Sequence, residues 1–184
     1  MIKDTIVNRL KTLLAFRLFF VTLLLGSIYV FKIGGDFFPY PKQLNYLIIW
    51  LYSLSLIYSV LLLKVGNRAF AYVQLCLDVI SANALIFLTG GIGSWFSFIL
   101  LLIVIASVII IGQRAGYIIA LLGSMIYGGM VDLQFYGILP LPFDVMLREK
   151  DFFYNIFSHF IALFLTAYLT GHLHGRLEKT TRKL

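Results

Sequence analysis

Six long apolar runs, separated by short polar segments, limit what this chain can fold into. Each run is close to the roughly 20 residues that cross a bilayer. Lipid offers no hydrogen-bond partners to the backbone, so segments of this length must satisfy their N–H and C=O groups internally, as α-helices. The sequence therefore predicts an all-α, polytopic membrane protein, a six-transmembrane-helix bundle with spans near residues 13–31, 44–63, 70–88, 95–111, 116–134 and 152–173.

The composition agrees with this fold class, because 61% of the 184 residues are hydrophobic and only 12% are charged. Soluble domains carry about 25% charged residues. The net charge of +7 does not indicate nucleic-acid binding, since the basic residues lie at the ends of the apolar runs. Cys76 is the only cysteine, which excludes a disulfide within the chain.

Lysine and arginine are distributed unequally between the two sides of the predicted bundle, and the richer side is expected to be cytoplasmic. The poorer side receives Lys32, Lys42, Arg148 and Lys150. We therefore expect both termini in the cytoplasm, with a cytoplasmic segment at 1–12, a transmembrane domain at 13–173 and the start of a cytoplasmic helix at 174–184. The richer side receives Lys3, Arg9, Lys11, Lys64, Arg68, Arg114, Arg176, Lys179, Arg182 and Lys183.

A short uncharged turn joins the third run to the fourth. Gly90 and Gly91 can adopt positive φ and end a helix where a β-carbon would clash. Ser94 is a suitable N-cap for the next helix, and Trp95 suits the boundary between membrane and water. The two runs are therefore predicted to be antiparallel neighbours.

Polar side chains inside the membrane are costly unless they are paired. Arg17 and Asp78 lie at overlapping depths from the same side, so we expect an ion pair between the first and third helices. Gln74 shares a helical face with Asp78, Asn83 lies nearer the middle, and His159 lies about two turns inside the sixth helix. These five residues form a candidate intramembrane polar network, which either holds the helices together or senses a signal.

Small residues recur at every fourth position of the fifth run and end in an acidic residue: Gly116, Ala120, Ser124, Gly128 and Asp132. Small side chains allow another helix to approach closely. One interpretation is packing within the bundle, and the other is a groove for a foreign transmembrane helix with Asp132 as its polar contact. Asp132 is also a candidate partner for His159 in a protonation-sensitive pair.

The sixth run continues into a polar segment in which Leu173, Leu177 and Leu184 are spaced along one side of a helix. This pattern predicts that the sixth helix extends out of the membrane and begins a coiled coil that carries a signal out. The alternative is a short basic tail held to anionic lipid. His172 and His174 would point to nearly opposite sides of the helix, so they do not form a metal pair.

No catalytic, cofactor-binding or metal-binding motif is found in the sequence. The Gly-Gly-Ile-Gly-Ser turn lacks the serine spacing of a nucleophile elbow and the lysine of a phosphate loop. We therefore do not expect this segment to be an enzyme.

Several stretches together resemble a known family: Asp78 inside an apolar run, Leu88–Phe96, Leu101–Ser107, Gln113–Gly116 and Met125–Gly129. Arg17 and the passage Gly171–Leu177 fit the same pattern. The chain is similar to the N-terminal membrane region of type IV pilus regulatory sensor histidine kinases, which are PilS-like and related to the NtrB group.

The resemblance implies a six-helix sensor region followed by a PAS-type domain, a dimerising phospho-acceptor helix pair and a kinase domain that uses ATP and Mg²⁺. The parent would be a homodimer that phosphorylates its own histidine and passes the phosphate to a response regulator. In this family the membrane region is thought to detect the major pilin. The phospho-acceptor and ATP-binding motifs are not found in these residues, so no kinase activity is assigned to them.

The first interpretation is therefore a signal-input domain, because the short outer loops leave little room to capture a water-soluble ligand. A small transporter is the second interpretation, weakened by the lack of broken helices in matched positions. A structural membrane scaffold is the third.

Overall fold

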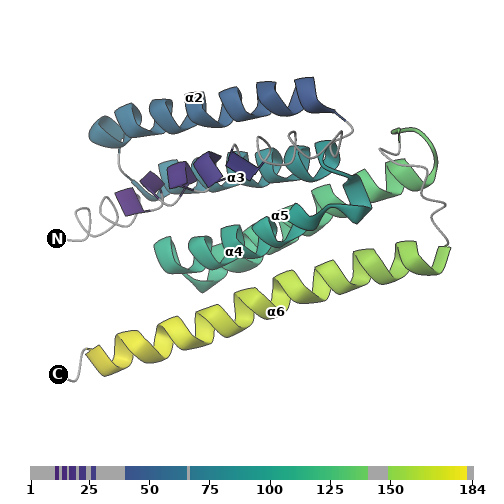
Figure 1. Cartoon of the computed structure of the whole chain (residues 1–184). Helices are drawn as coiled ribbons and strands as arrows, with labels where there is room; N and C mark the ends of the chain where they lie inside the picture. Colours follow the sequence, from purple (N-terminus) through teal and green to yellow (C-terminus); the bar gives the residue numbers. More distant parts are fainter. Residues whose placement is uncertain are drawn as a thin grey trace.

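The computed structural model describes residues 11–12, 14–15, 17–19, 21–23, 26–27, 40–65, 67–140 and 149–181. These form α2 (Pro41–Val65), α3 (Arg68–Leu88), α4 (Phe98–Ile110), α5 (Gln113–Phe135) and α6 (Glu149–Thr181), with two short 3-10 turns at Gly91–Gly93 and Trp95–Ser97. The described residues of the first run are also helical. The chain is thus an all-α protein whose long axes lie side by side in one bundle (Figure 1).

Four described helices are long and apolar enough to cross a membrane, with spans at Lys42–Leu61, Arg68–Leu88, Gln113–Phe135 and Phe152–Arg176. Their bounds agree with four of the six predicted runs. The fourth run is shorter, because α4 has 13 residues and so is only about 20 Å long at 1.5 Å per residue. Two short 3-10 turns precede α4 in place of the further helical turn that the sequence predicted.

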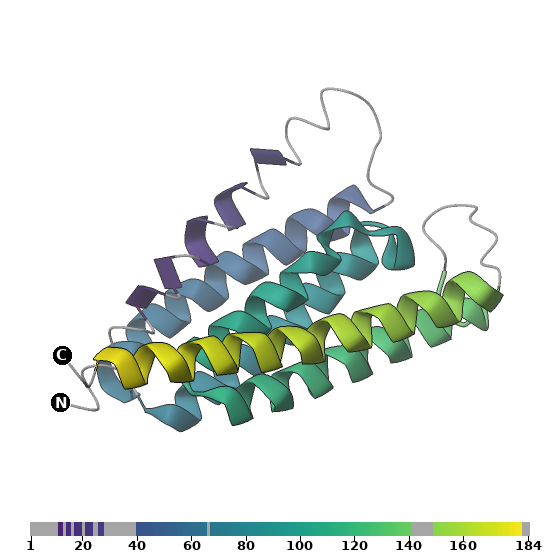
Figure 2. The same ribbon diagram turned by 90° about the horizontal axis from the view of Figure 1, so that it is seen from below.

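The connection between α3 and α4 has the backbone that its glycines predicted. Gly90 has φ 135° and Gly91 has φ 57°, both in the region that side chains with a β-carbon avoid. The Ser94 hydroxyl accepts a hydrogen bond from the Phe96 N–H at 3.2 Å and lies 2.6 Å from the Thr89 hydroxyl. The connection stops short of the ends of α5 and α6, as Figures 1 and 2 both show.

Proline and asparagine set where α2 and α3 begin. Pro41 is the first residue of α2, a position where its missing N–H is not needed for helical hydrogen bonding. Asn67 caps α3, because its side-chain oxygen accepts a hydrogen bond from the Phe70 N–H at 2.9 Å. Proline therefore starts a described helix and does not interrupt one.

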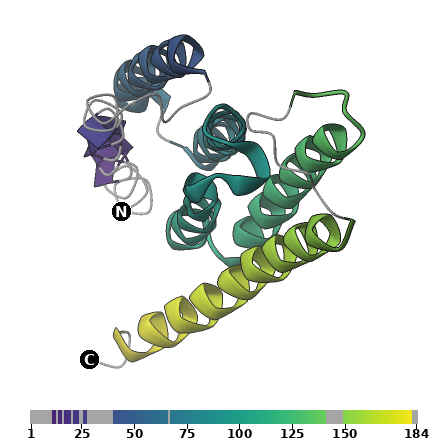
Figure 3. The same cartoon turned by 45° about the vertical axis from the view of Figure 1, so that its right-hand side comes forward.

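The bundle has a main core and a smaller one. In the main core α4, α5 and α6 pack against one another and α3 packs on α4 and α5, around Leu100, Ile119 and Leu163. The smaller cluster joins the first run, α2 and α3 through Leu14 and Tyr58. Hence α2 and the described part of the first run form one side of the bundle and α6 the other (Figure 3).

The last helix is the longest and continues beyond its neighbours. It runs without a break for 33 residues, about 50 Å at 1.5 Å per residue. Its C-terminal part extends past the α4–α5 turn and reaches about as far as the neighbouring end of α2 (Figures 1 and 2). The sixth helix therefore continues through the polar segment as far as Thr181, and Leu184 lies outside the described residues.

Candidate functional site

Arg17 and Asp78 form an ion pair, as their depths in the sequence indicated. Arg17 Nη1 lies 2.6 Å from Asp78 Oδ1, and the two side chains are 9% and 13% exposed. The guanidinium also lies over the ring of Tyr58, 5.0 Å from its centroid. The pair therefore joins the first run to α3, and the cation–π contact adds α2, which the sequence did not predict.

The other members of the predicted polar network do not join this pair through hydrogen bonds. Gln74 is fully buried, and within the described residues its side-chain amide has no partner. The Asn83 amide donates to the Val79 carbonyl oxygen on its own helix at 2.9 Å. The five predicted residues therefore divide into the Arg17–Asp78 pair on one side of the bundle, two buried amides on α3, and His159 on α6.

His159 belongs to a second polar cluster between α5 and α6. Its imidazole stacks on Tyr127 with ring centroids 4.3 Å apart, and its Nδ1 lies 3.0 Å from the Asn155 carbonyl oxygen. The Tyr127 hydroxyl donates to Asn155 Oδ1 at 2.5 Å. Asp132, the candidate partner of His159, is exposed, and among the described residues no ion pair joins the two.

Sequence reasoning missed Tyr127 and Asn155, which hold α5 to α6. One signal was available: Asn155 precedes His159 by four residues, so both lie on one face of the sixth run. Nothing in the sequence indicates that Tyr127 is the residue opposite them. That pairing depends on how α5 is rotated about its own axis.

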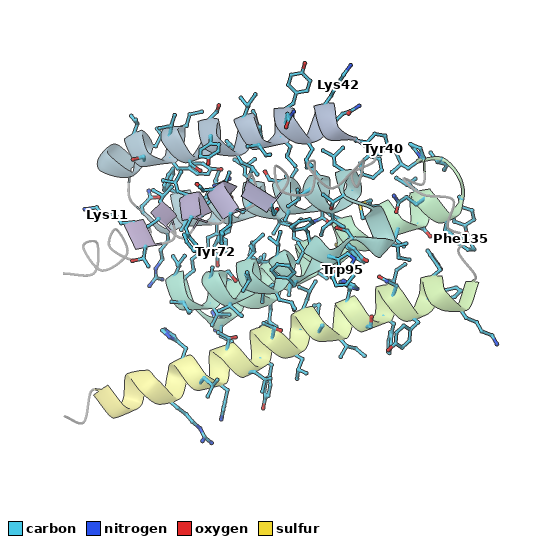
Figure 4. The ribbon with its side chains drawn as sticks, in the orientation of Figure 1. Lys11, Tyr40, Lys42, Tyr72, Trp95 and Phe135 are labelled. Atoms are coloured by element: carbon cyan, nitrogen blue, oxygen red, sulfur yellow. The ribbon has the colours of Figure 1, made fainter. Side chains whose placement is uncertain are left out.

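A pocket of about 250 Å³ lies next to His159, between the start of α4 and the middle of α6. Its polar residues are Ser97, Ser158 and His159, and its apolar walls come from Phe98, Leu101, Ala162 and Leu163. The pocket is close to Trp95, which Figure 4 labels at the α3–α4 connection and which is 85% exposed. The α4 wall lies in the short apolar helix Trp95–Ile110 and the α6 wall in the span Phe152–Arg176.

The structure divides the small-residue stripe on α5 between the interior of the bundle and its surface. Four residues advance a helix by about 40° beyond a full turn, so residues at this spacing drift by roughly 160° from the first to the fifth. Gly116 therefore packs inside the bundle against Val108 and Ala167, and Ala120 is fully buried. Asp132, at the other end, is exposed.

The accessible part of the stripe is its second half. Ser124 is half-buried, and a β-carbon on Gly128 would lie 3.8 Å from Ile156 on α6. Gly129 is exposed, and a β-carbon there would meet nothing within 4 Å. Within the stripe and its neighbour Gly129, a second helix therefore has access at Ser124, at the edge of Gly128, and at Gly129 and Asp132.

The predicted signal-output residues begin where α6 leaves the bundle. Gly171 is buried against Gln113 at the start of α5, and Gly116 meets Ala167 one turn earlier on α6. Leu173 is 61% exposed, and Leu177 is placed by the structure only as part of α6. The described residues contain no group of three His, Cys, Asp or Glu side chains that could hold a metal ion.

Comparison with known proteins gives one match. The family model described as a PilS-like transmembrane domain matches residues 3–184. No curated protein and no solved structure matches the chain.

Proposed function

Because the chain belongs to the PilS-like transmembrane domain family, we propose that it is the membrane signal-input region of a two-component sensor histidine kinase. The signal is received within the bacterial inner membrane and passes through α6 to cytoplasmic kinase domains outside this sequence. Those domains would use ATP and Mg²⁺, dimerise, and transfer phosphate to a response regulator.

The observation that carries this proposal is the single unbroken helix α6. It contributes Asn155 and His159 to the polar cluster with α5, then Ala167 and Gly171 to close contacts with α5, and then continues past the α4–α5 turn. A rotation or shift of α6 at the pocket end therefore moves its free end as well, since a helix is stiff over this length. A coupling of about 1–3 kcal/mol suffices to change output several-fold.

The outer half of α5 is the surface we assign to a partner helix, and the candidate partner is the transmembrane helix of the major pilin. Two features support this surface: Ser124 and Gly129 leave room for close backbone approach, and Asp132 offers an exposed polar contact. Gly116 and Ala120 have no part in it, because α4 and α6 already cover them.

Cysteine crosslinking in cells tests this assignment. Cysteine replaces Gly129 in a Cys76→Ala background of the full-length protein and is paired with cysteines along the pilin transmembrane helix. We expect a crosslink confined to one face of the pilin helix. Crosslinks of equal yield all round the pilin helix, or none, would overturn the assignment.

A matched pair of substitutions tests the functional consequence. Gly129→Leu adds bulk where a side chain meets nothing in the bundle, and Ile118→Phe adds bulk on the same lipid-facing side of α5 but nearer its start. We expect Gly129→Leu to abolish the change in autophosphorylation caused by pilin, and Ile118→Phe to leave it unchanged. An unaltered response in Gly129→Leu would refute the partner surface.

A further inference from the structure

The pocket between α4 and α6 has the features of a binding site for a molecule dissolved in the membrane. One wall comes from α6, which is long and apolar enough to cross a membrane, and the other from the short apolar helix Trp95–Ile110, so we place its opening within reach of lipid. Its volume of about 250 Å³ lies just below the range of roughly 300–1,000 Å³ typical of ligand pockets. It therefore fits the head of a lipid-soluble molecule whose tail stays in the bilayer.

The polar atoms of the pocket define the hydrogen bonds that a ligand must make. His159 Nδ1 lies 3.0 Å from the Asn155 carbonyl oxygen, which can only accept, so Nδ1 carries the proton. In the neutral imidazole Nε2 is then left as an acceptor. The Ser158 hydroxyl already donates to Asn155, whereas the Ser97 hydroxyl has no partner within the described part of the chain. The site thus offers an acceptor at His159 and a donor at Ser97.

This arrangement matches a hydroxyl group and does not match an anion. Among the described residues that line the pocket there is no lysine or arginine to supply a counter-charge for a buried phosphate or carboxylate. A hydroxyl can donate to His159 Nε2 and accept from Ser97. Two planar rings also line the pocket: the Phe98 ring and the His159 imidazole, which stacks on Tyr127. An aromatic ligand packs well against planar rings of this kind.

We propose that this pocket binds a hydroxyl-bearing aromatic ring on an apolar tail, the chemistry of a reduced membrane quinol. Binding alone is proposed, with no electron or proton transfer. The ligand would touch His159, whose ring is stacked on Tyr127 of α5, so occupancy would act on the α5–α6 contact. That regulatory consequence rests on the proposed signalling function, and the binding itself does not.

The test measures binding to the chain in phospholipid nanodiscs. The probe is a ubiquinol with a decyl tail, kept reduced under anaerobic conditions, and the readouts are saturable retention and the ¹⁵N shift of His159 Nε2. We expect saturable binding with a shift at Nε2.

Ala162→Phe, which fills the pocket, should weaken binding at least tenfold, and Ser97→Ala several-fold. Leu165→Phe, on the exposed side of α6, is the control and should bind as wild type.

Two further probes identify the part of the ligand that is recognised. The dimethyl ether of the quinol, which cannot donate, should bind about tenfold more weakly. Equal binding of dioleoylglycerol would overturn the assignment of the ring, and equal binding to Ala162→Phe would overturn the pocket.

Protection of a cysteine at position 162 by a pilin transmembrane peptide but not by the quinol would show that a helix occupies the site. These readouts require no kinase, so a failure of the signalling proposal leaves them intact.

Discussion

Truncating Asp78 should be among the most destabilising single substitutions in the chain. Asp78→Ala leaves Arg17 in place, 9% exposed and with the Tyr58 ring as its one remaining partner among the described residues. At the observed 2.6 Å the attraction between the two charges is about 6 kcal/mol for an effective dielectric constant of 20. The cost of desolvating both charges offsets part of this, and removing one partner of such a pair costs about 3–5 kcal/mol. The cation–π contact keeps about 0.5–2 kcal/mol, so we expect a net loss of about 3 kcal/mol.

The assay is reversible unfolding by sodium dodecyl sulfate in mixed micelles, followed by circular dichroism. The decisive comparison is a double-mutant cycle with Arg17→Leu and Asp78→Leu. Each single variant should be destabilised, whereas the double variant should be close to wild type, because both charges are then removed from the apolar interior. Single-variant losses below about 1 kcal/mol that add in the double variant would refute the reasoning.

Three other predictions can be checked by the same unfolding measurement. Gly91→Ala should cost about 1–2 kcal/mol, because Gly91 has φ 57° and a β-carbon there would meet the Gln134 side chain; a loss below 0.3 kcal/mol would contradict this. Gly116→Leu should cost at least about 1–3 kcal/mol through overpacking against Val108, whereas Gly129→Leu should be within about 0.5 kcal/mol of wild type; equal losses would be inconsistent with the rotation of α5 described above. Tyr127→Phe should cost about 0.5–1.5 kcal/mol, because it removes the hydrogen bond to Asn155 but keeps the stacking on His159; no loss would show that the hydroxyl does not hold α5 to α6.

The Gly90–Gly91 turn and the Arg17–Asp78 pair illustrate what a sequence of this kind indicates well. A turn between two apolar runs has few backbone solutions, and positive φ at Gly90 and Gly91 is one that glycine marks directly. A charge inside lipid requires a partner at the same depth, and few such partners are available in six runs. The turn is constrained by the local backbone, and the ion pair is constrained by the depth of its two residues in the membrane.

The stripe of small residues on α5 shows that depth in the membrane does not determine which side of a helix is buried. Spacing by four residues places Gly116 in the core and Asp132 on the surface, since the helix turns about 40° at each step. The length of α4 is a second example, because its apolar run includes Trp95, Phe96 and Ser97, which the structure places in a 3-10 turn. Both outcomes depend on contacts with residues far away in the chain.

The sequence by itself determined the membrane class, the positions of four spans, the α3–α4 turn and the two residues of the intramembrane ion pair. Lipid makes these features almost independent of neighbours, because an unpaired backbone group or charge is costly wherever it lies. The tertiary structure decided which face of each helix is buried, that Tyr127 and Asn155 hold His159, and that a pocket lies beside it. Those features depend on the rotation of each helix about its axis. Rotation is set by packing many side chains at once, and apolar runs with little periodicity leave it undetermined.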